Sequence, residues 1–171
     1  YTIIGVVPAV FMVNTEELRG REFPKSWSDL LNPEFEGSIS IPTMDFDLFN
    51  AILLNIYKEY GEDGVRSLGK SMFRSMHPAE MVKAHEKKNN SKVPTVTIMP
   101  YFFTRMVRED SPLKPVWPED GAIISPVFLL TKEKTKEKTK PIVDFLFSNE
   151  VGELMSTNGK FPSTNPKVDN D

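Results

Sequence analysis

Short apolar runs alternate with stretches of helical periodicity along most of this chain, and the alternation limits the possible folds more than any other feature. Thr2–Val13, Ser38–Ile41 and Thr95–Met99 have the composition of buried strands, and Gly5 and Pro8 are expected to interrupt the first. Strands that alternate with helices form mainly parallel sheets flanked by helices. The sequence therefore predicts an α/β fold with Ser38–Ile41 and Thr95–Met99 in one sheet.

The helical stretches have recognisable ends. Apolar residues recur at helical spacing from Phe46 to Tyr60, Gly61 marks the end of that helix, and a second helix is predicted from about Glu62 to Phe73. Further helices are predicted for Phe23–Pro33, from His77 into the polar stretch His85–Lys92, and for Pro100–Met106, Lys132–Phe147 and Asn149–Thr157; further strands are predicted for Pro115–Trp117 and Ala122–Leu130. The polar tail Pro162–Asp171 is expected to be loose.

Composition excludes several classes of function. The 171 residues carry a net charge of −3, with acidic and basic residues mixed along the chain, whereas nucleic-acid binding usually shows as a basic excess. The absence of cysteine excludes disulfides, thiolate metal sites and a cysteine nucleophile. The longest apolar stretches, Ile3–Val13 and Ala122–Leu130, are too short to span a membrane. Because the chain lacks a basic excess, a nucleic-acid partner is not expected.

Three segments resemble a known family. Pro24–Pro42 (PKSWSDLLNPEFEGSISIP), Pro118–Pro126 (PEDGAIISP) and Ile142–Gly152 (IVDFLFSNEVG), with Asn158-Gly159 and Pro162 after the last, occur in order with sensible spacing. They resemble motifs of ABC-transporter periplasmic solute-binding proteins of the type II fold, and the ferric-iron-type branch most of all. The resemblance implies a protein that closes two lobes on a small solute and delivers it to an ABC permease.

The resemblance also implies a domain organisation. Residues 1–13 would form a crossover strand, residues 14–120 the second lobe, and residues 121–171 the return crossover, the closing helices of the first lobe and the C-terminal tail. The resemblance also implies that the N-terminal part of the first lobe lies outside this sequence. Self-association that covers the first-lobe helices is one expected consequence. The implied location is extracytoplasmic, in the periplasm or anchored at the cell surface.

Ligands of open α/β sheets bind beyond the carboxyl ends of the strands. Thr43 and Asp45 follow one predicted strand, where they can cap a helix whose free N–H groups favour an anion, and His77 stands at the head of a later helix. Tyr101 and Phe102 follow another strand, in the position where ferric-binding relatives often carry two adjacent tyrosines. His77 and Tyr101 are the candidate metal ligands, although each residue type also serves as a cap or in a core.

Glu119 and Asp120 lie at the return crossover, where they either supply carboxylates to a cation or shape the turn before Gly121. Phenol, imidazole and carboxylate together suit a hard or borderline metal ion. The favoured solute is therefore ferric iron or an iron complex, carried as the transported ligand, and no cofactor is required. Because Phe102 stands in place of the second tyrosine, an organic anion remains open.

Rival functions belong to other classes. Asp45, His77 and Glu119 contain the groups for acid–base catalysis, but the sequence has none of the common catalytic motifs, and no enzymatic activity is expected. A ligand-sensing or regulatory module of the same fold, binding a small organic anion, is the main alternative. A partner-binding domain without a small ligand is a third.

Overall fold

A computed structural model of the chain describes residues 1–86 and 92–170. The chain forms two compact units: unit 1 comprises Tyr1–Pro8 and Ile124–Asp171, and unit 2 comprises Ala9–Ile123. The end of the helix predicted to run into His85–Lys92 lies largely outside the described residues. No helix in the described part of the chain is long and apolar enough to cross a membrane.

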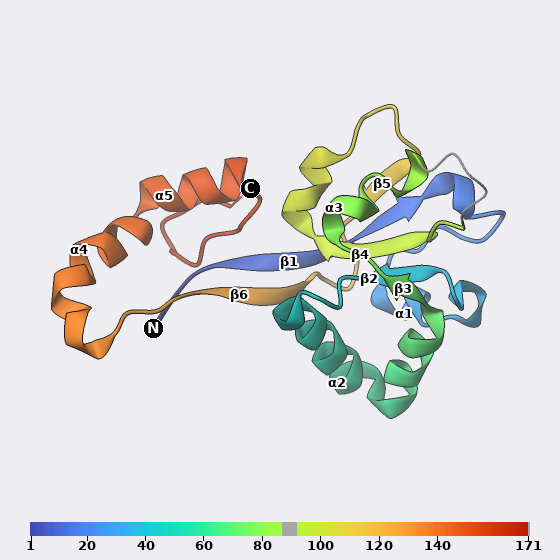
Figure 1. The fold of residues 1–171 in the computed structure, drawn as a ribbon, viewed down its shortest axis with the longest axis horizontal. Coiled ribbons are helices and arrows are strands. Elements are labelled where there is room, and N and C mark those ends of the chain that lie inside the picture. Colours follow the sequence, from blue (N-terminus) through green and yellow to red (C-terminus); the bar gives the residue numbers. More distant parts are fainter. Residues whose placement is uncertain (87–91, 171) are drawn as a thin grey trace. The chain divides into compact units, whose positions relative to one another are not determined.

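The strands form one mixed sheet (Figure 1). They are β1 (Thr2–Asn14), β2 (Ile39–Ile41), β3 (Met72–Ser75), β4 (Val96–Pro100), β5 (Leu113–Val116) and β6 (Ile123–Leu129). Their order is β3-β2-β4-β1-β5, and β6 pairs with β1. β2 is parallel to β3 and to β4, with Ile39 opposite Val96, which confirms that the two predicted strands share a sheet.

β1 differs from the prediction because neither Gly5 nor Pro8 interrupts it. Its antiparallel ladder with β4 begins at Ala9, opposite Pro100, so the missing N–H of Pro8 removes no bond from that ladder. The N–H of Val6 donates to the carbonyl oxygen of Pro162 at 2.9 Å. The expected interruption is therefore wrong, since both residues lie where extended backbone still finds its partners.

The helices are α1 (Trp27–Leu30), α2 (Phe46–Ser71), α3 (Pro78–Met81), α4 (Lys136–Leu146) and α5 (Asn149–Glu153). Shorter 3-10 turns lie at Thr15–Glu17, Pro33–Phe35, Ala84–Glu86, Tyr101–Met106 and Glu133–Thr135, and a π turn follows α5 at Leu154–Asn158. Gly61 has φ 65° and ψ −161°, so it breaks α2 into two segments where the sequence predicted a helix end. The second segment stops at Ser71 rather than Phe73, because Met72 pairs with β2 as the start of β3.

Two apolar clusters cover the two faces of the sheet in unit 2. One face carries Phe11, Ile39 and Ile98, which pack with α1 and α2 and are completely buried. The other face carries a methionine-rich cluster in which Met12, Met76, Met81 and Met99 are buried with Val82, Ala84 and Leu113. Figure 1 shows α2 and α3 on opposite sides of the strands of unit 2. These buried methionines pack the core of this face.

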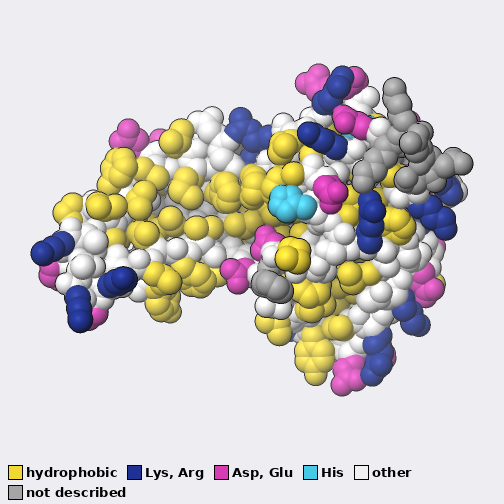
Figure 2. Space-filling model, viewed as in Figure 1, with side chains coloured by type: hydrophobic (Ala, Val, Ile, Leu, Met, Phe, Trp, Pro, Cys, Tyr) yellow, Lys and Arg dark blue, Asp and Glu magenta, His cyan; other side chains and the backbone are white. Residues whose placement is uncertain are grey.

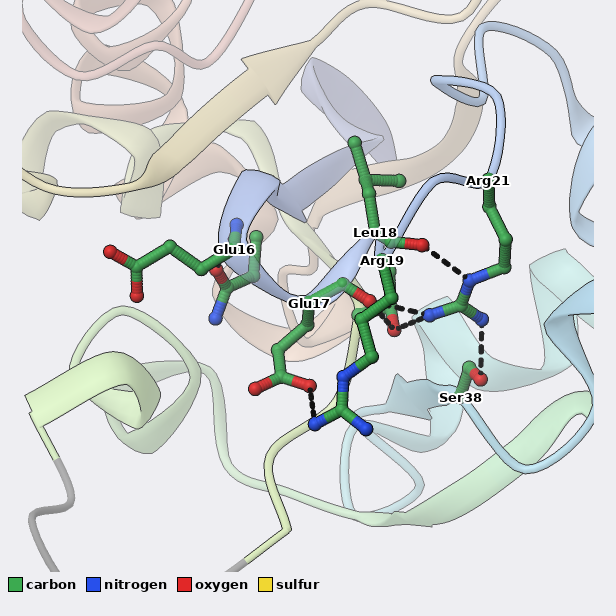
Figure 3. A network of polar contacts seen from close by, with 8 residues as sticks. Glu16, Glu17, Leu18, Arg19, Arg21 and Ser38 are labelled. Carbon is green, nitrogen blue, oxygen red and sulfur yellow. Dashed lines mark hydrogen bonds and ion pairs between the residues drawn. The ribbon is translucent and has the colours of Figure 1, made fainter.

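A single arginine fixes the loop that follows β1 (Figure 3). The Arg21 guanidinium donates to the carbonyl oxygens of Leu18 at 2.9 Å, Glu17 at 2.6 Å and Glu34 at 3.0 Å. It also donates to the hydroxyls of Ser38 and Thr95, and it lies over the Phe35 ring. Because these contacts occupy all five of its N–H groups, Arg21 ties the loop to the start of β2 and β4.

The C-terminal tail is not loose, contrary to expectation. The backbone N–H of Ser163 donates to Asn170 Oδ1 at 2.7 Å, and Asn165 Nδ2 donates to the carbonyl oxygen of Phe147 at 2.7 Å. Gly5 and Ser163 form an isolated antiparallel bridge. The polar composition that suggested a loose segment instead supplies side-chain amides that bond the backbone.

Candidate functional site

The carboxyl ends of three strands in unit 2 meet at one pocket. β2 leads into Pro42, β3 leads into Met76, and β4 ends at Pro100. A pocket of about 520 Å³ lies there, lined by Pro42, Met44, Asp45, Asp47, Met76, His77, Pro78, Pro100, Phe102 and Phe103. We call it the strand-end pocket. It lies at the edge of a parallel sheet segment, where α/β proteins place their ligands.

Asp45 caps α2 at the pocket. Its carboxylate accepts a hydrogen bond from the N–H of Leu48 at 3.2 Å, and its carbonyl oxygen accepts one from the N–H of Phe49 at 2.8 Å. Asp47 follows in the first turn of α2 and is exposed. Two carboxylates therefore stand at the helix end where the backbone dipole is positive, and they compensate it locally.

His77 is held by hydrogen bonds on both its ring and its backbone. Its Nδ1 accepts a hydrogen bond from the N–H of Ala79 at 3.2 Å, and its own N–H donates to Glu80 Oε2 at 3.4 Å. The ring meets the Phe103 ring edge-on, with centroids 6.4 Å apart. A nitrogen that accepts a hydrogen bond carries no proton, so the neutral ring holds its proton on Nε2.

Aromatic rings form another part of the pocket wall. Phe102 and Phe103 pack with their centroids 4.3 Å apart, and both line the pocket. Tyr101 instead meets Trp117 edge-on, with centroids 5.3 Å apart, and it is not among the described residues that line the pocket. The hydroxyl of Thr43 hydrogen-bonds that of Ser75.

The crossover carboxylates lie against α1. The N–H of Trp27 donates to both carboxylate oxygens of Asp120, at 3.0 and 3.2 Å, and Trp27 Nε1 donates to the carbonyl oxygen of Gly121 at 3.0 Å. The N–H of Glu119 donates to the carbonyl oxygen of Lys25 at 2.8 Å, and the two exposed side chains form an ion pair at 3.8 Å. These contacts shape the turn before Gly121, which has φ 94°.

The structure thus brings Asp45, His77 and Phe102 together at one pocket. Thr43 bonds to the end of β3, Tyr101 packs on Trp117, and Glu119 and Asp120 bond to the segment around α1. Sequence reasoning missed Met44, Asp47, Met76 and Phe103 as pocket residues. Their signal was available in part, because Met44, Asp47 and Phe103 lie within a few residues of a proline that follows a predicted strand, whereas Met76 follows β3, which the sequence did not predict.

The arrangement of possible metal ligands is sparse in the described ranges. Residues 1–86 and 92–170 contain no group of three or more His, Asp or Glu side chains placed to hold a metal ion together. Asp45, Asp47 and His77 all line the strand-end pocket, but the tautomer of His77 leaves Nε2 as a hydrogen-bond donor. Metal ligation by His77 and Tyr101 stays a prediction.

Comparison with known proteins places the whole chain in one family. A family model of bacterial extracellular solute-binding proteins matches residues 1–171. A search of curated proteins finds no match. The fold is similar to that of the apo ferric ion-binding protein A from Pasteurella haemolytica, with 12% identity and a TM-score of 0.74 over 98% of this chain and 57% of that one.

Two further solved structures share the fold. The periplasmic binding protein AfuA from Actinobacillus pleuropneumoniae, solved with fructose-6-phosphate, is 23% identical with a TM-score of 0.70 over 99% of this chain and 56% of that one. A two-component system protein that mediates signal transduction is 18% identical with a TM-score of 0.71 over 98% of this chain and 57% of that one. The chain therefore spans little more than half the length of these structures. It has the type II periplasmic-binding-protein fold and belongs to the family of bacterial extracellular solute-binding proteins.

Proposed function

We propose that the protein is the extracytoplasmic solute-binding component of an ABC importer, and that the strand-end pocket is the share of its solute site that unit 2 provides. The observation that carries this proposal is the pocket itself, because a volume of about 520 Å³ at the ends of β2, β3 and β4 suits a small molecule. Family membership supports capture and delivery to a membrane permease rather than catalysis.

The pocket supports a solute held through hydrogen bonds and apolar contacts rather than by direct metal coordination from unit 2. His77 Nε2 is a donor, and Phe102 stands where the resemblance to ferric-binding proteins implies a second tyrosine. An iron complex, one of the solutes expected from the sequence, fits this chemistry when its organic ligands make the contacts. Fold similarity to a ferric ion-binding protein supports iron as the cargo.

The test is native mass spectrometry of the full-length protein, purified from its own compartment without added ligand, together with elemental analysis for iron. Retention of one small organic mass, or of such a mass with iron, is expected. Asp45→Ala and Phe102→Ala should both lower the fraction that retains this mass. Unchanged retention in both variants would place the solute outside the strand-end pocket and overturn the proposal.

A sensing module is the second candidate function. Its support is the fold similarity to a two-component signalling protein over 98% of this chain. The two candidates differ in their membrane partner, a permease for transport and a sensor protein for signalling. Crosslinking of the full-length protein in its own cells, followed by identification of the attached membrane protein, separates them.

Unit 1 has an apolar face that supports a further contact. Ile142 and Phe145 on α4 and Leu154 on the π turn after α5 are 60%, 58% and 59% exposed. Large apolar side chains that gather on one surface are usually covered in soluble proteins. The similar solved structures contain over 40% of their length beyond what this chain matches. We infer that this face is covered in the functional protein, either by polypeptide equivalent to the unmatched part of the similar structures or by a second copy of the chain.

A further inference from the structure

We propose that the part of the solute that enters the strand-end pocket is an organic ammonium group attached to an apolar body. This inference rests on the proposed function and adds the chemical class of the ligand. It is drawn from the charges, the walls and the donors of the pocket, all of which belong to unit 2. Figure 2 shows the setting on the surface of unit 2, where acidic side chains and a histidine lie among hydrophobic ones.

The charges of the pocket lining favour a positively charged group. Asp45 and Asp47 line the pocket, and none of its described lining residues is Lys or Arg. An α-helix N-terminus normally attracts anions, but here the carboxylate of Asp45 already accepts the N–H of Leu48 and Asp47 stands in the first turn. A solute carboxylate or phosphate placed here would face two carboxylates. An ammonium group would instead be attracted to both.

The walls favour an apolar body next to that charge. Phe102 and Phe103 pack at 4.3 Å, and Met76 is buried at 3% exposure while also lining the pocket. Pro42, Pro78 and Pro100 complete the apolar part of the lining. Aromatic rings also attract cations through their faces, which adds to the preference for an ammonium group over a neutral hydroxyl.

His77 supplies a hydrogen-bond donor in the lining of the strand-end pocket. Because its Nδ1 accepts the N–H of Ala79, Nε2 carries the proton and can donate to an acceptor atom of the solute. The same bond disfavours coordination of a bare metal ion by His77. A protonated Nε2 has no lone pair for a metal, and freeing Nδ1 would break the cap of α3.

The experiment compares probes of one shape and different charge. Titration calorimetry of the full-length protein, with any retained solute removed, would use 2-phenylethylammonium and phenylacetate as probes of similar size and opposite charge, and ferric chloride as the bare metal. We expect the ammonium probe to bind roughly tenfold more tightly than the carboxylate, since two partly exposed charge pairs differ in sign between them. Binding of the bare metal should be no tighter than that of the ammonium probe.

Variants separate this proposal from the folding of the pocket. Asp45→Asn keeps a good helix cap while removing its charge, and Asp47→Asn removes the second charge; both should reduce the ammonium preference. Asp110→Asn is the matched control, because Asp110 is an exposed carboxylate paired with Arg108 and does not line the pocket. His77→Asn keeps a capping side chain but removes the Nε2 donor, and it should weaken binding of probes that carry an acceptor.

The outcomes distinguish failure of the proposed ammonium preference from failure of the proposed site. Equal or tighter binding of phenylacetate, or an ammonium preference unchanged in both Asp45→Asn and Asp47→Asn, would overturn the ammonium proposal. If an anionic solute retained from the cell is lost on Phe102→Ala, the site stands and only its proposed charge preference fails. If no pocket variant changes retention of the natural solute, the proposed site itself fails.

Discussion

The carboxylate of Asp120 holds the N–H of Trp27 through both of its oxygens, at 3.0 and 3.2 Å, across 93 residues of sequence. Trp27 is the first residue of α1, and its indole Nε1 donates to Gly121 next to Asp120. The crossover segment before β6 is thereby fixed to α1 within unit 2. Asp120, singled out as a possible cation ligand, has a structural partner.

Removing this carboxylate should destabilise unit 2. Asp120→Ala leaves the N–H of Trp27 without its charged acceptor, and a lost helix cap costs about 1–2 kcal/mol. Asp120→Asn retains one acceptor oxygen and should lose less. Urea unfolding followed by tryptophan fluorescence measures both. Equal stability of wild type and Asp120→Ala would contradict the anchoring role.

Arg21 should not tolerate lysine. Its planar fork donates to backbone carbonyl oxygens and two hydroxyls, and a lysine ammonium cannot reach the same set (Figure 3). Arg21→Lys should lower the free energy of unfolding by about 2 kcal/mol. Arg66→Lys is the control, because Arg66 is exposed and pairs only with Glu62 among the described contacts. Similar midpoints for the two variants would show that the fork is dispensable.

Asp29 makes stability depend on pH. Burial raises the pKa of this carboxyl, but hydrogen bonds from the N–H groups of Lys25 and Ser26 and from the Ser26 hydroxyl outweigh it, so the pKa lies below its ordinary value of 3.8. A depressed folded-state pKa contributes stability that is present above the unfolded value and is lost as the pH falls through the folded one. The urea midpoint of the wild type should therefore decrease as the pH is lowered through 3.8 and below. The decrease should be shallower in Asp29→Asn, which has no carboxyl group to protonate at this position.

Two glycines of α2 should respond in opposite ways to alanine. Gly61 has φ 65° and ψ −161°, a region that is nearly exclusive to glycine, so Gly61→Ala should cost about 1–3 kcal/mol. Gly69 lies in the helix with open space around an added Cβ, and Gly69→Ala should be neutral or should stabilise by up to about 1 kcal/mol. Thermal denaturation of the pair checks this, and a drop in both would point to a packing role for Gly69.

Solute affinity should fall in His77→Ala and in Tyr101→Phe. His77 lines the strand-end pocket, whereas Tyr101 packs on Trp117 and only its neighbours Pro100 and Phe102 line the pocket, so the effect of His77→Ala should be the larger. Titration calorimetry of the full-length protein with the solute identified by mass spectrometry measures both. If neither affinity changes, the site lies elsewhere.

The sequence by itself determined the elements with strong periodicity or punctuation. The alternation of apolar runs and helical stretches predicted the α/β fold, the shared sheet of β2 and β4, and the break at Gly61. The prolines and caps after the strands also pointed to Asp45, His77 and Phe102, which the pocket brings together. These features are local, since each depends on residues within one or two turns of each other.

Only the tertiary structure decided the rest. β3 forms because Met72 finds β2, and β1 continues through Pro8 because its ladder partner begins one residue later. The tail is ordered by Asn165 and Asn170, whose amides bond backbone far along the chain or across a turn. The hydrogen bonds between Trp27 and Asp120 and the ring contact between Tyr101 and Trp117 also join residues far apart in the sequence. Most of these pairings join groups that are far apart in the sequence but close together in the folded protein. Local sequence patterns do not say which such groups come close.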